Sequence, residues 1–111
     1  MTDLIQLWNS TQDLYERFDL DSPNEDRRRK LIEEVLELIT VSVLEDNGHG
    51  GYRDIINEAA DVIVTVLGLL QGHDIEYDDL LTAMGRIAEK NNAKTTETHH
   101  IVNGLITRRK S

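Results

Sequence analysis

The sequence predicts an all-α protein of four helices followed by a short C-terminal β-hairpin. Four segments repeat their apolar residues at helical spacing, and clusters of Gly, Pro, Asn and Asp separate them. The tail instead places Asn103-Gly104 between two runs rich in β-branched residues, a strong short-range signal for a two-residue hairpin turn. The chain has 111 residues, and we expect residues 1–111 to form a single domain.

The first two helices are predicted at residues 3–18 and 24–45. The segment DLDSPNED separates them and contains the only proline of the chain. Ser22 precedes Pro23, and Glu25 follows three residues after Ser22, a pattern typical of a capped helix start. The second helix is expected to end in DNGHGG, whose three glycines predict a turn. Large apolar or aromatic side chains define the first helix: Leu4, Leu7, Trp8, Leu14, Tyr15 and Phe18.

The remaining elements are predicted at residues 52–71, 77–92 and 98–108. Gly72 ends the third helix, and the last range is the hairpin. Because only a short turn joins the second and third helices, we expect them to lie antiparallel. The apolar face of the fourth helix consists of Leu80, Leu81, Met84, Ile87 and Ala88, and it continues onto Asn91.

Composition and charge narrow the classes of function. The net charge of −9 disfavours nucleic acid as the main partner, because phosphate backbones are bound by clustered Lys and Arg. The chain has no cysteine and no run of eighteen apolar residues, which favours a cytoplasmic protein without a membrane span. A chain of this size buries only about two-thirds of its unfolded surface, so we expect a homo-oligomer, a dimer or a tetramer.

Two pairs of carboxylates are predicted to face each other across the second and third helices. Glu34 and Glu37 precede the turn, and Glu58 and Asp61 follow it at a matching distance. At a rise of about 1.5 Å per residue, both pairs stand roughly 18 Å from the turn. Glu58 and Asp61 also begin a polar stripe on a helix that is otherwise almost wholly apolar, so we expect that stripe to meet another helix.

Converging carboxylates need a cation or a proton. In a partly buried site they repel each other and lose hydration, unless some are protonated or a cation neutralises them. Oxygen ligands without Cys or His favour hard ions such as Mg²⁺, Mn²⁺ or Ca²⁺. Mg²⁺ keeps several waters and commonly binds substrate phosphates as well. The pattern therefore predicts a phosphate-ester substrate.

The motif resembles the MazG-like all-α nucleoside triphosphate pyrophosphohydrolases. Glu34-x-x-Glu37, a gap of 20 residues and then Glu58-x-x-Asp61 agree with the ExxE…ExxD pattern of that family in order, spacing and residue type. The segments LIEEVLEL, EAADVIVTVLGLL and RIAEKNNAK extend the resemblance over residues 24–94. It implies a four-helix oligomeric enzyme that converts a (d)NTP to a (d)NMP and pyrophosphate, with Mg²⁺ as cofactor and Mn²⁺ able to substitute. Nucleotide-pool cleaning is the implied role.

The resemblance also implies roles for individual residues. The metal ligands are Glu34, Glu37, Glu58 and Asp61. Glu33 is the expected base for the attacking water, next to the catalytic ligand Glu34, and the expected contacts to the nucleotide are Lys30, Asn91 and Lys94. The reaction would be attack of a water, activated by the cation, on the α-phosphorus.

Three other classes compete with this interpretation. A phosphoribosyl-ATP pyrophosphohydrolase shares the acidic pattern, and the Asn91-to-Lys94 segment favours the MazG-like site over it. A non-enzymatic helical interaction module would carry the same acids without a metal. A ferritin-like di-metal bundle needs Glu-x-x-His pairs on two helices, whereas only Glu97-x-x-His100 has that spacing, and it lies in the predicted hairpin region.

Overall fold

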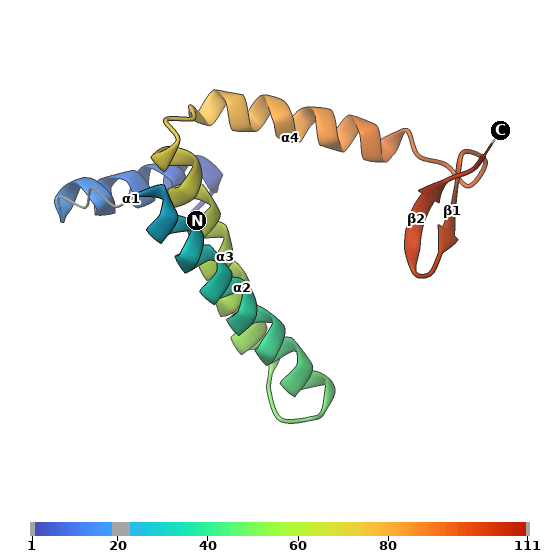
Figure 1. The fold of residues 1–111 in the computed structure, drawn as a ribbon, viewed down its shortest axis with the longest axis horizontal. Coiled ribbons are helices and arrows are strands. Elements are labelled where there is room, and N and C mark those ends of the chain that lie inside the picture. Colours follow the sequence, from blue (N-terminus) through green and yellow to red (C-terminus); the bar gives the residue numbers. More distant parts are fainter. Residues whose placement is uncertain (1, 19–22, 111) are drawn as a thin grey trace. The chain divides into compact units, whose positions relative to one another are not determined.

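The structure, a computed structural model, describes residues 2–18 and 23–110. It confirms four helices and a C-terminal antiparallel hairpin (Figure 1). Every bound lies within one residue of its predicted position. Ser22, the predicted cap of the second helix, lies outside the described residues. The elements are α1 (Leu4–Arg17), α2 (Asn24–Asp46), α3 (Tyr52–Gly72), α4 (Tyr77–Asn92), β1 (His99–Val102) and β2 (Leu105–Arg108).

The chain divides into two compact units, and α1, α2 and α3 belong to the first, Met1–Tyr77. Helices α2 and α3 run antiparallel side by side, as predicted, and residues 47–51 join them (Figure 1). Gly48, at φ +77°, ends α2 in the left-handed conformation that favours glycine. His49 N then donates to Leu44 O at 2.8 Å and Gly48 N to Glu45 O at 2.9 Å, a Schellman cap. This turn fixes the register in which α3 returns along α2.

Helix α1 packs on the far end of α3, and both helices supply the residues of the small core. Trp8 is buried, and its ring lies 5.5 Å from that of Tyr77. Tyr15 approaches Gly68 so closely that a Cβ there would lie 3.0 Å from the tyrosine oxygen. The Arg27 guanidinium lies over the Tyr15 ring, 4.1 Å from its centroid, and donates to Gly68 O. These contacts tie the start of α2 to α1 and α3.

The core of the isolated chain is unusually small. Among the described residues, Trp8 and Leu67 are the buried hydrophobic ones. Helix α2 is apolar on two opposite faces, and only one of them meets α3. The other face, here called the outer stripe of α2, is between 52% and 61% exposed and consists of Ile32, Leu36, Ile39 and Val43. Its residues recur at i, i+4, i+7 and i+11, which is the spacing of a helix packing surface.

Helix α3 is long and apolar enough, by length and composition, to cross a membrane. The helix has 21 residues, and its most apolar 18-residue window has a mean hydropathy of 1.4. The core helix of a soluble protein passes the same test. Glu58 and Asp61 lie in its first half, and carboxylates are costly within a bilayer. We therefore interpret its apolar surface as a surface for contact with protein.

The second unit, Asp78–Ser111, contains almost all of α4 and the hairpin. Asn103 and Gly104 have φ values of 52° and 78°, which suit the predicted two-residue turn. The register pairs His99 with Arg108 and Ile101 with Ile106. None of the residues of α4 is buried.

Candidate metal site

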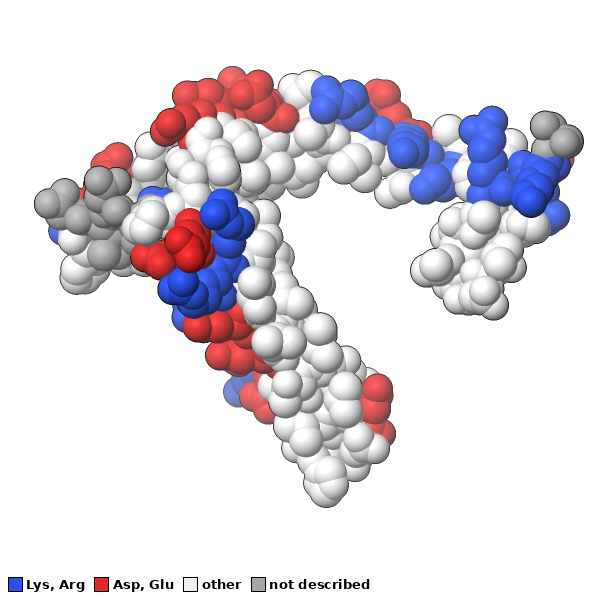
Figure 2. All heavy atoms as spheres, in the orientation of Figure 1, with Lys and Arg blue, Asp and Glu red and all other residues white. Residues whose placement is uncertain are grey.

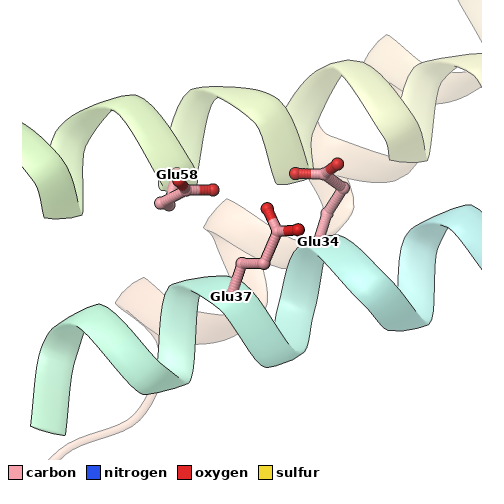
Figure 3. A group of neighbouring side chains, drawn as sticks. All are labelled: Glu34, Glu37 and Glu58. Carbon is pink, nitrogen blue, oxygen red and sulfur yellow. The ribbon is translucent and has the colours of Figure 1, made fainter.

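Three glutamates gather between α2 and α3. One carboxylate oxygen from each of Glu34, Glu37 and Glu58 lies within 4.8 Å of the other two (Figure 3). Glu34 is only 6% exposed, Glu58 is half-buried and Glu37 is exposed. The cluster therefore has a buried floor and opens to solvent on the side of Glu37.

The helix faces explain this arrangement. Glu34 shares the inward face of α2 with Leu31, Leu38 and Val41, which are all partly buried. Glu58 occupies the corresponding face of α3, one turn before the partly buried Val62. Residues three or four apart lie on the same side of a helix, so the apolar packing of α2 on α3 forces both carboxylates into the interface.

Two carboxylate oxygens in this cluster lack a protein partner. Glu34 Oε2 and Glu58 Oε2 are buried and accept no hydrogen bond among the described residues. The other oxygen of Glu34 accepts from Lys30 Nζ at 2.9 Å. This hydrogen bond and the charge of Glu34 raise the pKa of Lys30. One ammonium group therefore partly compensates three carboxylates.

The excess negative charge also affects Glu58. Burial raises the pKa of Glu58, and the nearby charge of Glu37 raises it further, followed by a hydrogen bond with Glu37 and the charges of Asp61 and Glu34. All these causes disfavour the ionised form of Glu58. A divalent cation would reverse the balance, because it favours the deprotonated carboxylates.

We expect Mg²⁺ affinity to fall as the pH is lowered through the raised pKa of Glu58, because the ion then competes with a proton for that carboxylate. In the metal-free protein the same shift stabilises the fold at low pH. This stabilisation is fully present below the unfolded pKa and is lost as the pH rises through the folded pKa. Calorimetric Mg²⁺ titrations at several pH values test the change in affinity. Thermal melts in EDTA at the same pH values test the change in stability of the metal-free protein. A metal affinity independent of pH would contradict this account.

The donor set fits a hard divalent ion. All three clustered groups are carboxylates, and two of their buried oxygens need a partner that the described part of the chain does not supply. Such oxygens match the ligand preference of Mg²⁺ or Mn²⁺. Glu34, Glu37 and Glu58 could therefore hold a metal ion.

The fourth predicted ligand is Asp61. It is exposed and lies outside the group of three. Its charge nevertheless contributes to the raised pKa of Glu58. Asp61 follows Glu58 by three residues and lies about one turn further along α3, but its side chain is exposed.

The other predicted site residues fall into two groups. Glu33 is exposed beside the cluster, with Oε2 4.0 Å from Lys30 Nζ. Asn91 and Lys94 belong to the second unit, where Lys94 Nζ lies 3.4 Å from Asn91 Oδ1. Both line a pocket with Thr95, Thr96, His99 and His100. The sequence pattern does not single out these four residues, because residues after a helix end carry no periodic signal.

A helical hairpin with a carboxylate cluster between its two long helices defines a class of protein: an all-α domain whose acidic side chains could hold a divalent cation. A family model described as phosphoribosyl-ATP pyrophosphohydrolase matches residues 9–88. The chain belongs to this family, within the MazG-like all-α NTP pyrophosphatase superfamily. The match includes Glu33, Glu34, Glu37, Glu58 and Asp61 and ends before Asn91. No curated protein and no solved structure matches the chain.

Proposed function

We propose that this protein is a Mg²⁺-dependent pyrophosphohydrolase acting on phosphoribosyl-ATP. The reaction would cleave the bond between the α- and β-phosphates and release pyrophosphate. The observation that carries the proposal is the cluster of Glu34, Glu37 and Glu58, with two buried oxygens that lack a protein partner. The family match adds the substrate, which the sequence analysis had placed second to a nucleoside triphosphate.

The side chains around the cluster suggest a division of roles. Mg²⁺, held by the three glutamates and by Asp61, would supply charge neutralisation for the phosphates and activate water. Lys30, already bonded to Glu34, is placed to turn its ammonium group toward a phosphate oxygen when a cation takes over that carboxylate. Glu33 is exposed and adjacent, so it is the group we assign as base for the attacking water.

If Glu33 is the base, its replacement should lower turnover without weakening substrate binding. Glu33→Gln keeps the size of the side chain but removes the basic carboxylate, so we expect kcat to fall by roughly 10²- to 10⁴-fold. Substrate affinity should change little, because Glu33 lies outside the metal-binding group. Steady-state kinetics together with binding of a non-hydrolysable analogue measure the two effects. A variant that retains its turnover would remove Glu33 from the mechanism.

A nucleoside triphosphate is the second candidate substrate. The acidic pattern is shared with MazG-like enzymes, and Asn91 and Lys94, the residues expected to contact a nucleotide, lie together in one pocket. This pocket lies beyond the part of the chain that the family model matches. Hydrolysis of a (d)NTP to its monophosphate would use the same cluster and the same bond.

A substrate panel distinguishes the candidates. Phosphoribosyl-ATP, the standard dNTPs and NTPs, and their oxidised or deaminated forms would each be assayed for pyrophosphate with Mg²⁺ or Mn²⁺. We expect the highest kcat/KM with phosphoribosyl-ATP. A higher value with a dNTP or NTP would select the second candidate, and release of orthophosphate would exclude cleavage between the α- and β-phosphates. If no compound releases pyrophosphate, the helical interaction module replaces both enzyme assignments.

We also propose that the working form is a homo-oligomer. Two buried hydrophobic side chains among the described residues are a very small core for a chain of this length. The outer stripe of α2 is fully apolar, and α3 exposes Tyr52, Ile56 and Ile63. A second copy that packs on these surfaces would provide the missing apolar burial.

A further inference from the structure

A pocket of about 620 Å³ lies between the end of α4 and the hairpin in the second unit. Its size falls within the range of small-molecule binding sites. The pocket begins after the end of the family match at residue 88. Its lining residues also take no part in the acidic cluster. It is therefore a separate concave site whose ligand must be argued from its own chemistry.

One side of the pocket is suited to an anion. Lys94 is half-buried there, and within the described ranges it makes no ion pair. Its only described side-chain contact is with the neutral amide oxygen of Asn91. Thr95 and Thr96 add hydroxyl groups next to it. An ammonium group flanked by hydroxyls and an amide is a typical set of donors for a phosphate.

The local charge has the sign that an anion needs. Residues 90–110 carry five Lys or Arg side chains and a single acid, Glu97, although the whole chain is strongly acidic. Figure 2 shows these cations gathered over the end of α4 and the adjoining strands. Burial lowers the pKa of His99, and the charges of Lys94, Arg108 and His100 lower it further. The positive charges around His99 therefore contribute to its lowered pKa, after burial.

The opposite side of the pocket is apolar. Ile101 and Ile106 are partners across the two strands, so their side chains stand next to each other on one face of the hairpin. They are 74% and 68% exposed, and both line the pocket. His99 and His100 also line the pocket, and His99 lies on the same face of the hairpin as Ile101. Two aliphatic side chains on one face suit the flat face of a nucleobase.

We propose that the pocket at the α4–hairpin junction binds a nucleoside monophosphate without a metal ion. Lys94, Thr95 and Thr96 would hold the phosphate, and Ile101 and Ile106 would contact the base. This inference extends the role proposed for Asn91 and Lys94, but it requires neither the acidic cluster nor hydrolysis. Binding at the pocket therefore stands or fails separately from the proposed enzymatic activity.

Titration of the full-length chain with AMP in EDTA tests the proposal. Calorimetry gives the affinity, and the imidazole signals of the four histidines report the location. We expect AMP to shift the signals of His99 and His100 but not those of His49 and His73. Lys94→Ala should weaken AMP binding about tenfold, the effect of losing one charge-assisted hydrogen bond. Arg86→Ala, which removes an exposed cation of α4 outside the pocket, should change it less than twofold.

Two further variants test the base contact and the independence of the pocket from the acidic cluster. Ile106→Ser should weaken AMP binding severalfold and leave the weaker binding of inorganic phosphate unchanged. Glu58→Gln should bind AMP like the wild type. The proposal is overturned if AMP does not bind in EDTA, if Lys94→Ala and Arg86→Ala behave alike, or if Glu58→Gln abolishes AMP binding.

Discussion

Replacing Glu58 with glutamine should abolish Mg²⁺-dependent pyrophosphate release and raise the melting temperature of the metal-free protein. Activity falls because Glu58 is needed to bind the ion. The metal-free fold becomes more stable because the charge of Glu58 destabilises it. Its carboxylate lies between α2 and α3, close to Glu34 and Glu37, and one of its oxygens is buried without a hydrogen bond. Glutamine keeps the shape of the side chain and removes the charge.

The expected loss of activity is large. Removal of one group that stabilises charge in a transition state typically costs 10²- to 10³-fold in kcat, and the loss of a metal ligand should reach at least the upper end of that range. The gain in metal-free stability follows from the raised pKa of Glu58, since repulsion and burial already disfavour its ionised form. Pyrophosphate assays and thermal melts, with Mg²⁺ and with EDTA, measure both quantities.

Glu16→Gln is the matched control, because it removes the same charge from an exposed position on α1. It should leave both activity and the stabilisation by Mg²⁺ unchanged. The wild type should melt at a higher temperature with Mg²⁺ than with EDTA, whereas Glu58→Gln should melt at the same temperature in both. A Glu58→Gln variant that keeps its Mg²⁺-dependent melting shift would show that the ion binds elsewhere.

The fold was predictable from local signals that agree with each other. Gly48 and the surrounding residues predict the α2–α3 turn, and Asn103-Gly104 predicts the hairpin. Both turns need positive φ values, which only a few residue types adopt readily. With the turn in place, an antiparallel pair brings Glu34 and Glu37 beside Glu58 by simple counting along two helices. Helix periodicity and one turn therefore sufficed to predict that three of the four expected ligands lie close together.

Other features of the candidate sites depend on properties that residue spacing does not encode. Counting residues treats Glu58 and Asp61 as one pair, but only Glu58 lies on the face that α2 covers, while Asp61 is exposed. The ion pair between Lys30 and Glu34 depends on the rotamers of long side chains. The pocket beside Lys94 forms where a helix end meets a hairpin, and that meeting follows from chain geometry after residue 92 and not from a repeating pattern.

Replacing Ile39 with aspartate should convert the proposed oligomer into a monomer that is largely unfolded. Ile39 lies near the middle of the outer stripe of α2, which is apolar and exposed in the single chain. If a second copy covers this stripe, the new carboxylate would be buried without a partner. An uncompensated buried charge costs roughly 3 kcal/mol or more, which corresponds to at least about a 100-fold weaker association.

Ser42→Asp is the matched control for this substitution. It introduces the same charge on the same helix, at an exposed position about a quarter turn away from the outer stripe. Sedimentation velocity should show an unchanged oligomer for Ser42→Asp and dissociation for Ile39→Asp, and circular dichroism should show loss of helix only in the latter. The loss of helix follows because the described part of one chain buries only Trp8 and Leu67 as hydrophobic core, too little to hold three helices together. A wild-type protein that sediments as a stable monomer, or an Ile39→Asp variant that assembles normally, would mean that the stripe is solvated and that the chain is stabilised in another way.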